Sequence, residues 1–142
     1  MRPDANVLAF PCSLFVALAE EGWLEGELVE QIARKYLSPL FETPMPESVD
    51  TLVLGCTHFP ALRQAIQAVV GDGIRLIDSA ETTAKAVDSV LLEEGLKNNK
   101  TRKGEVELLV TDGPERFARV APFFLGRPVS VSQVELVDLS CV

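Results

Sequence analysis

The sequence predicts an α/β protein built on parallel sheets. Two observations support this fold class. The apolar pattern alternates along the chain between a period of two and a period of about 3.6, and short apolar runs are followed by longer amphipathic segments. With 142 residues, of which 47% are hydrophobic and 24% are charged, the chain is long enough to bury a core and polar enough to be soluble. One domain or two small ones are expected.

The first half of the chain is expected to contain two strands and three helices. The strands are predicted at residues 7–10 and 50–55, and the second run is apolar enough to indicate a strand buried on both faces. Apolar residues at helical spacing predict helices over 11–21, 24–38 and 59–70. Pro39 is suited to end the second helix and Gly71 the third.

The second half continues the alternation. Strands are predicted over 74–77, 105–110 and 134–139, and helices over 78–95 and 111–125. Asp78, followed three residues later by Glu81, is a capping signal for the first of these helices, and Gly95 is suited to end it. Pro114 fits the first turn of the second helix. The basic segment 97–104 is expected to be a solvated loop.

Charge and composition exclude several classes of protein. The balance of 13 Lys and Arg residues against 21 Asp and Glu residues gives a formal net charge of −8. Such a charge repels a nucleic-acid backbone and an anionic membrane surface, so neither is an expected partner. No apolar run approaches the roughly 18 residues of a membrane-spanning helix, and residues 1–13 lack a secretory signal pattern, which predicts a cytoplasmic protein.

The chain has three cysteines, Cys12, Cys56 and Cys141. Their number is odd and no Cys-x-x-Cys pair occurs, so they favour neither a disulfide framework nor a zinc site. Free thiols in a reducing compartment are expected instead.

One segment, LVLGCTHFP at residues 52–60, carries a thiol two residues before the single histidine of the chain. If the strand ends at Gly55 and a helix begins near Phe59, Cys56 lies at the carboxyl end of a parallel sheet, where ligands bind. The free N–H groups of the first helical turn favour an anion, so this thiol is expected to ionise more easily than an ordinary one.

The neighbouring residues suit a functional site, but they also allow a structural explanation. Gly55 lets a ligand approach the backbone, Thr57 can cap the helix or hold a carboxylate oxygen, and His58 can protonate a partner near neutral pH. Free cysteine is, however, commonly buried, threonine is a frequent N-cap, and histidine near a helix start often has a structural role. The residues alone leave both interpretations open.

The longer string LVLGCTHFPALRQAI, followed by IRLIDSAETTA, closely resembles glutamate racemase, whose signature is Leu-Gly-Cys-Thr-His-(Tyr/Phe)-Pro. The segment FPCSLFVALAEEG resembles the family's Cys-Pro-x-Phe-Val-Pro segment, and the FLGRPV tail resembles the family weakly. The resemblance covers nearly the whole chain. It implies parallel-sheet α/β lobes of the aspartate/glutamate racemase type, and an enzyme that uses neither a cofactor nor a metal.

The resemblance also implies residue roles in a reaction with two cysteines, one on each face of the substrate. Cys56 matches the second catalytic cysteine, which removes the α-proton of L-glutamate and returns one in the reverse direction. Inversion requires an acid and a base on opposite faces of a planar carbanion. Thr57 matches a substrate-binding position. His58 matches a residue that assists the cysteine and contacts the substrate.

Glu20 falls where the family has an acid that supports this histidine. The surrounding segment departs from the family pattern, because Ser13 and Ala17 stand where prolines are expected. The adjacent Glu21 leaves the alignment ambiguous between the two acids. Cys12 lies in the same family segment and is expected to be a thiol of the core rather than the other catalytic cysteine.

The family's opening motifs, Asp-Ser-Gly-Val-Gly-Gly, Tyr-Gly and Cys-Asn-Thr, do not occur in the sequence. The resemblance is therefore to the C-terminal half, with the fold incomplete on its N-terminal side. Residues 1–77 would be the latter part of an inserted α/β lobe, and residues 78–142 the return into the first lobe. An exposed apolar face is expected. The implied partners are glutamate, the missing N-terminal half and further copies of the chain in a homo-oligomer.

Three functions remain open. The first is a glutamate racemase half that supplies D-glutamate for peptidoglycan in its complete form and is inactive alone. The second is a non-catalytic truncated chain, or a carboxylate-binding module of the same fold. An aspartate racemase-like isomerase is a lesser alternative, because the signatures around its second cysteine differ.

Overall fold

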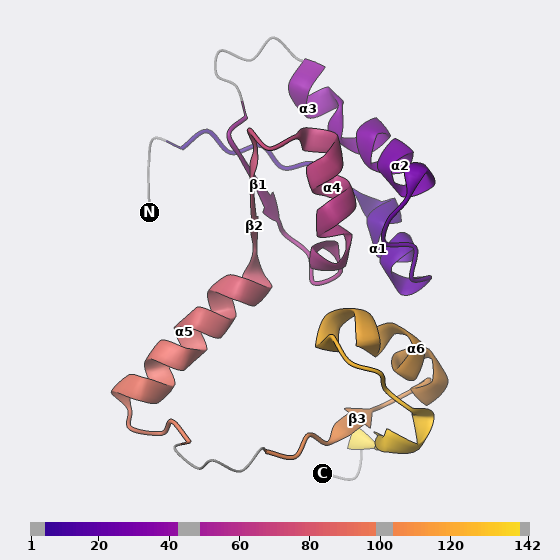
Figure 1. The fold of residues 1–142 in the computed structure, drawn as a ribbon, viewed down its shortest axis with the longest axis vertical. Coiled ribbons are helices and arrows are strands. Elements are labelled where there is room, and N and C mark those ends of the chain that lie inside the picture. The colour runs from indigo at the N-terminus through magenta and orange to yellow at the C-terminus, as the bar shows by residue number, and fades with distance from the viewer. Residues whose placement is uncertain (1–4, 43–48, 99–103, 140–142) are drawn as a thin grey trace.

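The computed structural model describes residues 5–42, 49–98 and 104–139, which form two parts joined by a long helix (Figure 1). The first part contains α1 (Ser13–Glu20), α2 (Glu27–Leu37), α3 (Pro39–Glu42), β1 (Thr51–Leu54), η1 (Phe59–Leu62), α4 (Arg63–Val70) and β2 (Arg75–Asp78). The joining helix is α5 (Ser79–Glu93). The second part contains β3 (Leu108–Val110), α6 (Pro114–Leu125), η2 (Val131–Gln133) and β4 (Val134–Leu136). The α/β fold class is confirmed.

The first sheet consists of β1 and β2, which pair in parallel with Leu52 opposite Leu76 and Leu54 opposite Asp78. Successive side chains of a strand point to opposite faces, so Leu54 is buried while Val53 is 66% exposed. The expectation that this strand is buried on both faces is therefore wrong. Helices cover one face of the pair, and within the described residues the other face lacks such a cover.

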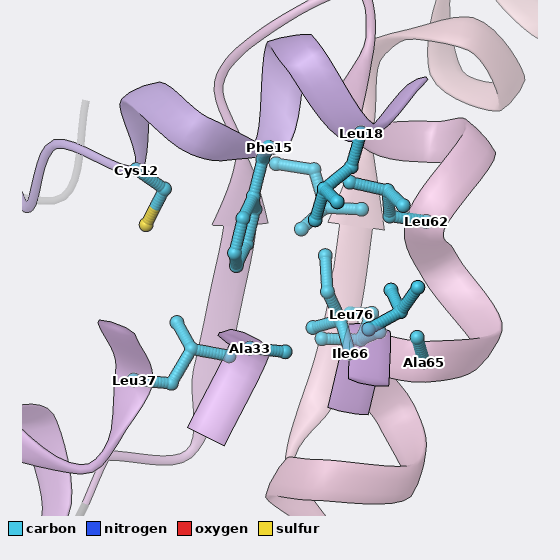
Figure 2. Packing of buried hydrophobic residues seen from close by; sticks show 11 residues of the cluster. Cys12, Phe15, Leu18, Ala33, Leu37, Leu62, Ala65, Ile66 and Leu76 are labelled. Atoms are coloured by element: carbon cyan, nitrogen blue, oxygen red, sulfur yellow. The ribbon is translucent and has the colours of Figure 1, made fainter. Parts of the chain in front are cut away.

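The main core lies between this sheet face and the helices α1, α2 and α4. Figure 2 shows side chains of these three helices and of β2 directed toward one another. Phe15, Leu62 and Ile66 are the largest of the fully buried side chains. The ring of Phe15 meets Tyr36 and Phe59 edge-on, with centroids 5.5 and 5.4 Å away. Burying a side chain of this size stabilises a protein by about 2 kcal/mol, so this cluster is the main source of stability in the first part.

The predicted strand at residues 7–10 is not present. These residues are irregular, and Val7 is 81% exposed. A strand is stabilised by pairing with a neighbour, and among the described residues β1 pairs with β2 rather than with this run. The β-forming residues there are therefore not sufficient to form a strand.

The predicted helix over 59–70 forms in two pieces. It opens with the 3-10 turn η1, which contains Pro60, and continues as α4 until Gly71, whose φ of +80° suits glycine. Of the two roles that the sequence left open for Thr57, capping this helix is not the one it has. His58 occupies the N-cap position and no side chain caps the turn. The hydroxyl of Thr57 thus remains available to the site described below.

The helix α5 is anchored at its start and exposed along its length. The carboxylate of Asp78 accepts the backbone N–H of Glu81 at 3.1 Å, as the capping signal predicted, and also accepts Nη1 of Arg63 at 2.7 Å. All fifteen residues of α5 are nevertheless exposed, including Val87, Val90 and Leu92. Figure 1 shows the helix running away from the first part. No helix in the described ranges is long and apolar enough to cross a membrane.

The second part is smaller and more thinly covered. Its strands β3 and β4 pair in parallel and are shorter than expected: β3 forms at the end of the predicted strand 105–110, and β4 at the start of the predicted strand 134–139. Among the described residues of this part, Ala118 and Ala121 of α6 are the buried hydrophobic ones. The predicted loop at 97–104 lies mostly outside the described residues. Because the second part has so little core of its own, we expect the contacts of α6 with the first part to hold the second part in place.

The contact between α6 and the first part centres on Gly22. This glycine follows α1 with a φ of +73°, and a Cβ atom added to it would lie 2.9 Å from the ring of Phe123. Glycine therefore serves twice here: it adopts the left-handed backbone that ends the helix, and it lets the aromatic ring approach the chain.

Replacing Gly22 by alanine is expected to destabilise the protein more than the same change at Gly95. Both glycines have left-handed φ values, +73° and +67°, so each substitution carries a backbone cost of about 1 kcal/mol. At Gly22 the half-exposed ring of Phe123 must also shift away from the added atom, which adds to that cost, whereas at Gly95 nothing lies within 4 Å of the added atom. Urea unfolding followed by the fluorescence of Trp23 measures both losses. A loss at Gly22 no larger than at Gly95 would contradict this contact.

Candidate active site

The candidate site begins where β1 ends. Cys56 lies two residues after Leu54, in the connection between β1 and η1, and β1 runs parallel to β2. The carboxyl ends of both strands therefore face the same edge of the sheet. This is the position predicted for the thiol from the sequence, and it is the edge at which α/β proteins bind ligands.

His58 lies beside the thiol. Its Nδ1 atom is 3.8 Å from Sγ of Cys56 and 3.5 Å from Oγ1 of Thr57. The tight turn into η1 holds these three residues together, since the N–H of Phe59 donates to the carbonyl of Cys56 at 3.3 Å. A proton can thus pass between the sulfur and the imidazole.

The other imidazole nitrogen contacts Glu20. The Nε2 atom of His58 lies 2.6 Å from Oε1 of Glu20, which is the last residue of α1. Because an ionised carboxylate only accepts hydrogen bonds, Nε2 must carry the proton and donate it. In the neutral imidazole this leaves the lone pair of Nδ1 facing Cys56. Of the two acids that the sequence left open, Glu20 is the one beside the histidine, and Glu21 is exposed.

The second oxygen of Glu20 is held from the other part of the molecule. Arg116, in the first turn of α6, donates to Oε2 through Nε at 2.9 Å and through Nη2 at 2.5 Å. The ring of Phe124, near the end of the same helix, meets the ring of His58 edge-on with centroids 6.3 Å apart. Contacts from α6 therefore reach both Glu20 and His58.

These contacts shift the pKa values of the three groups. The hydrogen bond to His58, assisted by Arg116 and opposed by burial, lowers the pKa of Glu20. The pKa of His58 is raised, first by the hydrogen bond to Glu20 and then by that to Cys56. Burial raises the pKa of Cys56, but the N–H groups of His58 and Phe59 and the imidazole outweigh it, so the pKa of this thiol is lowered. The arrangement favours a thiolate beside an imidazolium.

The remaining thiols differ in environment. Cys12 is 8% exposed at the edge of the main core, and burial raises its pKa, which agrees with the structural role expected for it. Cys141 lies outside the described residues.

Thr57 borders an open groove of about 630 Å³ between the β1–η1 connection and α5. The polar residues that line it include Ser79, Thr83 and Asp88, and the carboxylate of Asp88 is paired with Lys97. Its other walls are largely apolar, among them Val87 and Leu91 of the exposed helix. The groove can accommodate a small polar molecule beside Thr57, but it is wide open toward solvent.

Iodoacetamide is expected to label Cys56 at least roughly ten times faster than Cys12 at neutral pH, because only the thiolate reacts and the two pKa values move in opposite directions. Changing His58 to asparagine removes the imidazolium, so the pH midpoint for labelling of Cys56 should rise while the labelling of Cys12 stays unchanged. Peptide mass spectrometry across a pH series gives both rates. Labelling of Cys56 that is slower than that of Cys12 would refute the electrostatic argument.

Comparison with known sequences gives a consistent set of relatives. No protein-family model matches the chain. The glutamate racemase of Geobacter metallireducens is 42% identical over 137 residues, which are 96% of this chain and 49% of that protein. The glutamate racemase of Neisseria meningitidis serogroup A is 41% identical over 138 residues, 97% of this chain and 48% of that protein.

Solved structures agree with the sequences. The glutamate racemase of Francisella tularensis in complex with D-glutamate superposes with a TM-score of 0.81 at 33% identity, covering 99% of this chain and 50% of that one. The Thermus thermophilus enzyme in complex with beta-chloro-D-alanine gives a TM-score of 0.75 at 40% identity, covering 92% and 47%. The chain thus spans about half the length of the relatives it matches.

Arg116 is the residue of this site that the sequence did not reveal. It lies 96 positions from Glu20, and the segment around it indicates only a helix with a proline in its first turn. A basic residue on such a helix is ordinarily a solvated one, so no local signal distinguishes it from Arg119 on the same helix.

Proposed function

We propose, from the premise that this chain is homologous to one half of glutamate racemases, that it is the C-terminal half-site of such an enzyme. In it, Cys56 is one of the two acid–base groups that invert the α-carbon of glutamate. The observation that carries the proposal is the hydrogen-bonded series of Cys56, His58 and Glu20 at the carboxyl end of β1. A complete enzyme of this kind would supply D-glutamate for bacterial peptidoglycan.

The reaction needs two groups because its intermediate is planar. A thiolate on one face takes the α-proton, so a C–H bond breaks and an S–H bond forms. A thiol on the opposite face then gives a proton to the carbanion, and its own S–H bond breaks. We assign Cys56 to removal of the proton from L-glutamate. Transfer of its proton to Nδ1 of His58 produces the thiolate, while the hydrogen bond between Nε2 and Glu20 stabilises the imidazolium.

The thiol on the face of the substrate opposite Cys56 is proposed to come from the other half of the enzyme. Among the described residues the other cysteine is Cys12, which is buried in the main core and hydrogen-bonds weakly to the carbonyl of Phe10 at 4.0 Å. A thiol in that position cannot face a substrate held beside Cys56. In this proposal residues 1–77 belong to one lobe and residues 78–142 to the other, and substrate binds between them.

Thr57 and His58 are proposed to bind the substrate. The Thr57 side chain is exposed beside the groove, and its hydroxyl can donate to a carboxylate oxygen of glutamate. The groove is open because, in this proposal, the complementary half forms its second wall. The apolar surface of α5 is part of the same open side.

A second function has a specific observation in its favour. The exposed hydroxyl of Thr57 beside the groove favours, as the alternative, a non-catalytic chain that keeps only a carboxylate site. It predicts that residues 1–142 alone bind glutamate with an affinity that depends on Thr57, and that supplying the other half adds no turnover.

The proposal is tested with a fusion, in which the part of the Geobacter metallireducens glutamate racemase that this chain does not match is joined to the start of residues 1–142. Conversion of L-glutamate and of D-glutamate is followed by chiral chromatography, with L-aspartate as the competing substrate. We expect racemisation in both directions and a preference for glutamate. A folded fusion that converts neither amino acid would favour the binding module, and a preference for aspartate would favour the aspartate racemase-like alternative.

A further inference from the structure

Glu20 is held at both carboxylate oxygens by groups from different parts of the molecule. Oε1 meets Nε2 of His58 at 2.6 Å, and Oε2 accepts two N–H groups of Arg116. Because Nε and Nη2 of Arg116 both donate to Oε2, they leave Oε1 to His58. The carboxylate is thereby fixed in rotation as well as in place.

Further contacts of α6 with the first part hold Arg116 beside Glu20. Arg116 and Phe123 are seven residues apart, so they lie on one face of the helix. Phe123 packs against Gly22, two residues after Glu20 in the chain, and Phe124 meets the ring of His58. The same helix therefore contacts the end of α1 at two points and the imidazole at a third. Arg116 is itself 64% exposed, whereas Glu20 is 23% exposed.

We propose that Arg116 is a positioning residue for the candidate active site: by occupying Oε2 of Glu20 it directs Oε1 to Nε2 of His58, which leaves Nδ1 facing the sulfur of Cys56. Arg116 does not touch the reacting atoms. It sets which nitrogen of the imidazole carries the proton, and so it decides whether a proton can move between the sulfur and the ring. This inference rests on the proposed function for its role in racemisation, but the tautomer it predicts is a property of the chain itself.

The consequence for pH follows from the charged groups around this pair. Those that act on Glu20 are His58 and Arg116, and those that act on His58 are Glu20 and Cys56. Arg116 helps to keep Glu20 ionised, so the carboxylate accepts a hydrogen bond instead of taking the proton from His58. Without the arginine, Glu20 can rotate toward solvent, and the neutral imidazole is free to carry its proton on either nitrogen.

The first test is spectroscopic and uses the single histidine of the chain. In ¹⁵N-labelled residues 1–142, the ¹⁵N shifts of the imidazole report its tautomer above the pKa of the ring. We expect the Nε2-protonated form to dominate in the native chain and in Arg119→Gln, the matched control on the exposed face of α6. Arg116→Gln should give a mixture of both tautomers. A spectrum of Arg116→Gln identical to that of the control would overturn the proposal.

The second test separates positioning from a general loss of structure. Arg116→Ala should slow the labelling of Cys56 by iodoacetamide roughly threefold or more at neutral pH, in line with a partial loss of the thiolate. Dilute guanidinium should restore the rate, while sodium chloride at the same ionic strength should not. Restoration shows that the variant is folded and lacks only the donor. Equal rates in Arg116→Ala and Arg119→Ala would contradict the proposal.

The fusion connects this role to catalysis. There Arg116→Gln should lower kcat for L-glutamate by about tenfold, a fraction of the effect of a direct acid–base group, and leave KM nearly unchanged. Arg119→Gln should change neither. If the fusion itself is inactive, the proposed function fails while the tautomer measurement still decides the role of Arg116. An active fusion whose kcat is the same in both variants would overturn the positioning role in catalysis.

Discussion

Replacing Cys56 by alanine in the fusion should lower racemisation of glutamate at least roughly 10³-fold in both directions, because inversion needs an acid or a base on each face of the carbanion. The loss should appear in kcat, since the thiol acts on the reacting proton rather than on binding. Chiral chromatography of L- and D-glutamate over time measures it. Cys12→Ala is the matched control: it removes a sulfur from the core, where the cost is in stability, and should leave turnover near the native value.

Isotope exchange makes the same variant more informative. Once Cys56 is replaced, the fusion keeps only the catalytic thiol of the other half. In deuterium oxide this thiol can still exchange the α-proton of the enantiomer that it faces, without inverting it. The proposed assignment therefore predicts that Cys56→Ala stops exchange from L-glutamate and retains some exchange from D-glutamate. Retained exchange from L-glutamate, with none from D-glutamate, would reverse the assignment of faces.

The backbone amides of α5 should exchange with deuterium at least roughly 10²-fold more slowly in the fusion than in residues 1–142 alone. In the chain alone every residue of this helix is exposed, and an isolated helix of fifteen residues is marginal in water. The complementary half is expected to cover its apolar side chains. Mass spectrometry after deuterium labelling reports both proteins.

The helix α2 is the matched control for that measurement. It buries Val29, Ala33 and Leu37 in the main core and packs on α4, so its protection should be similar in the two proteins. The experiment is made at low concentration, because exposed apolar surface also favours association of the chain with itself, as the predicted homo-oligomer would require. Strong protection of α5 in residues 1–142, equal to that of α2 under these conditions, would contradict the expectation that the complementary half covers this helix.

Features that depend on local sequence could be predicted. The capping of α5 by Asp78 is a contact between residues three positions apart, and it forms as expected. The turn from β1 through Cys56 to η1 follows from an apolar run, a glycine and a proline in succession. In both places the residues that decide the structure are neighbours in the chain.

Features that depend on distant partners could not be predicted. The residues at 7–10 have strand-forming side chains, but whether a strand forms depends on a neighbour that local sequence does not specify. The exposed face of β1 likewise depends on what covers the sheet. The contact of Arg116 with Glu20 spans 96 positions, and only the return of the chain after α5 brings the two side chains together.

The most direct test of the central claim, that this chain contributes one of two acid–base groups and requires the other half, compares glutamate racemisation by residues 1–142 with that by the fusion. We expect no conversion by residues 1–142 above the enzyme-free background, and conversion by the fusion that Cys56→Ala abolishes. Turnover by residues 1–142 that survives purification and is lost in Cys56→Ala would contradict it, because both groups would then have to lie within this chain.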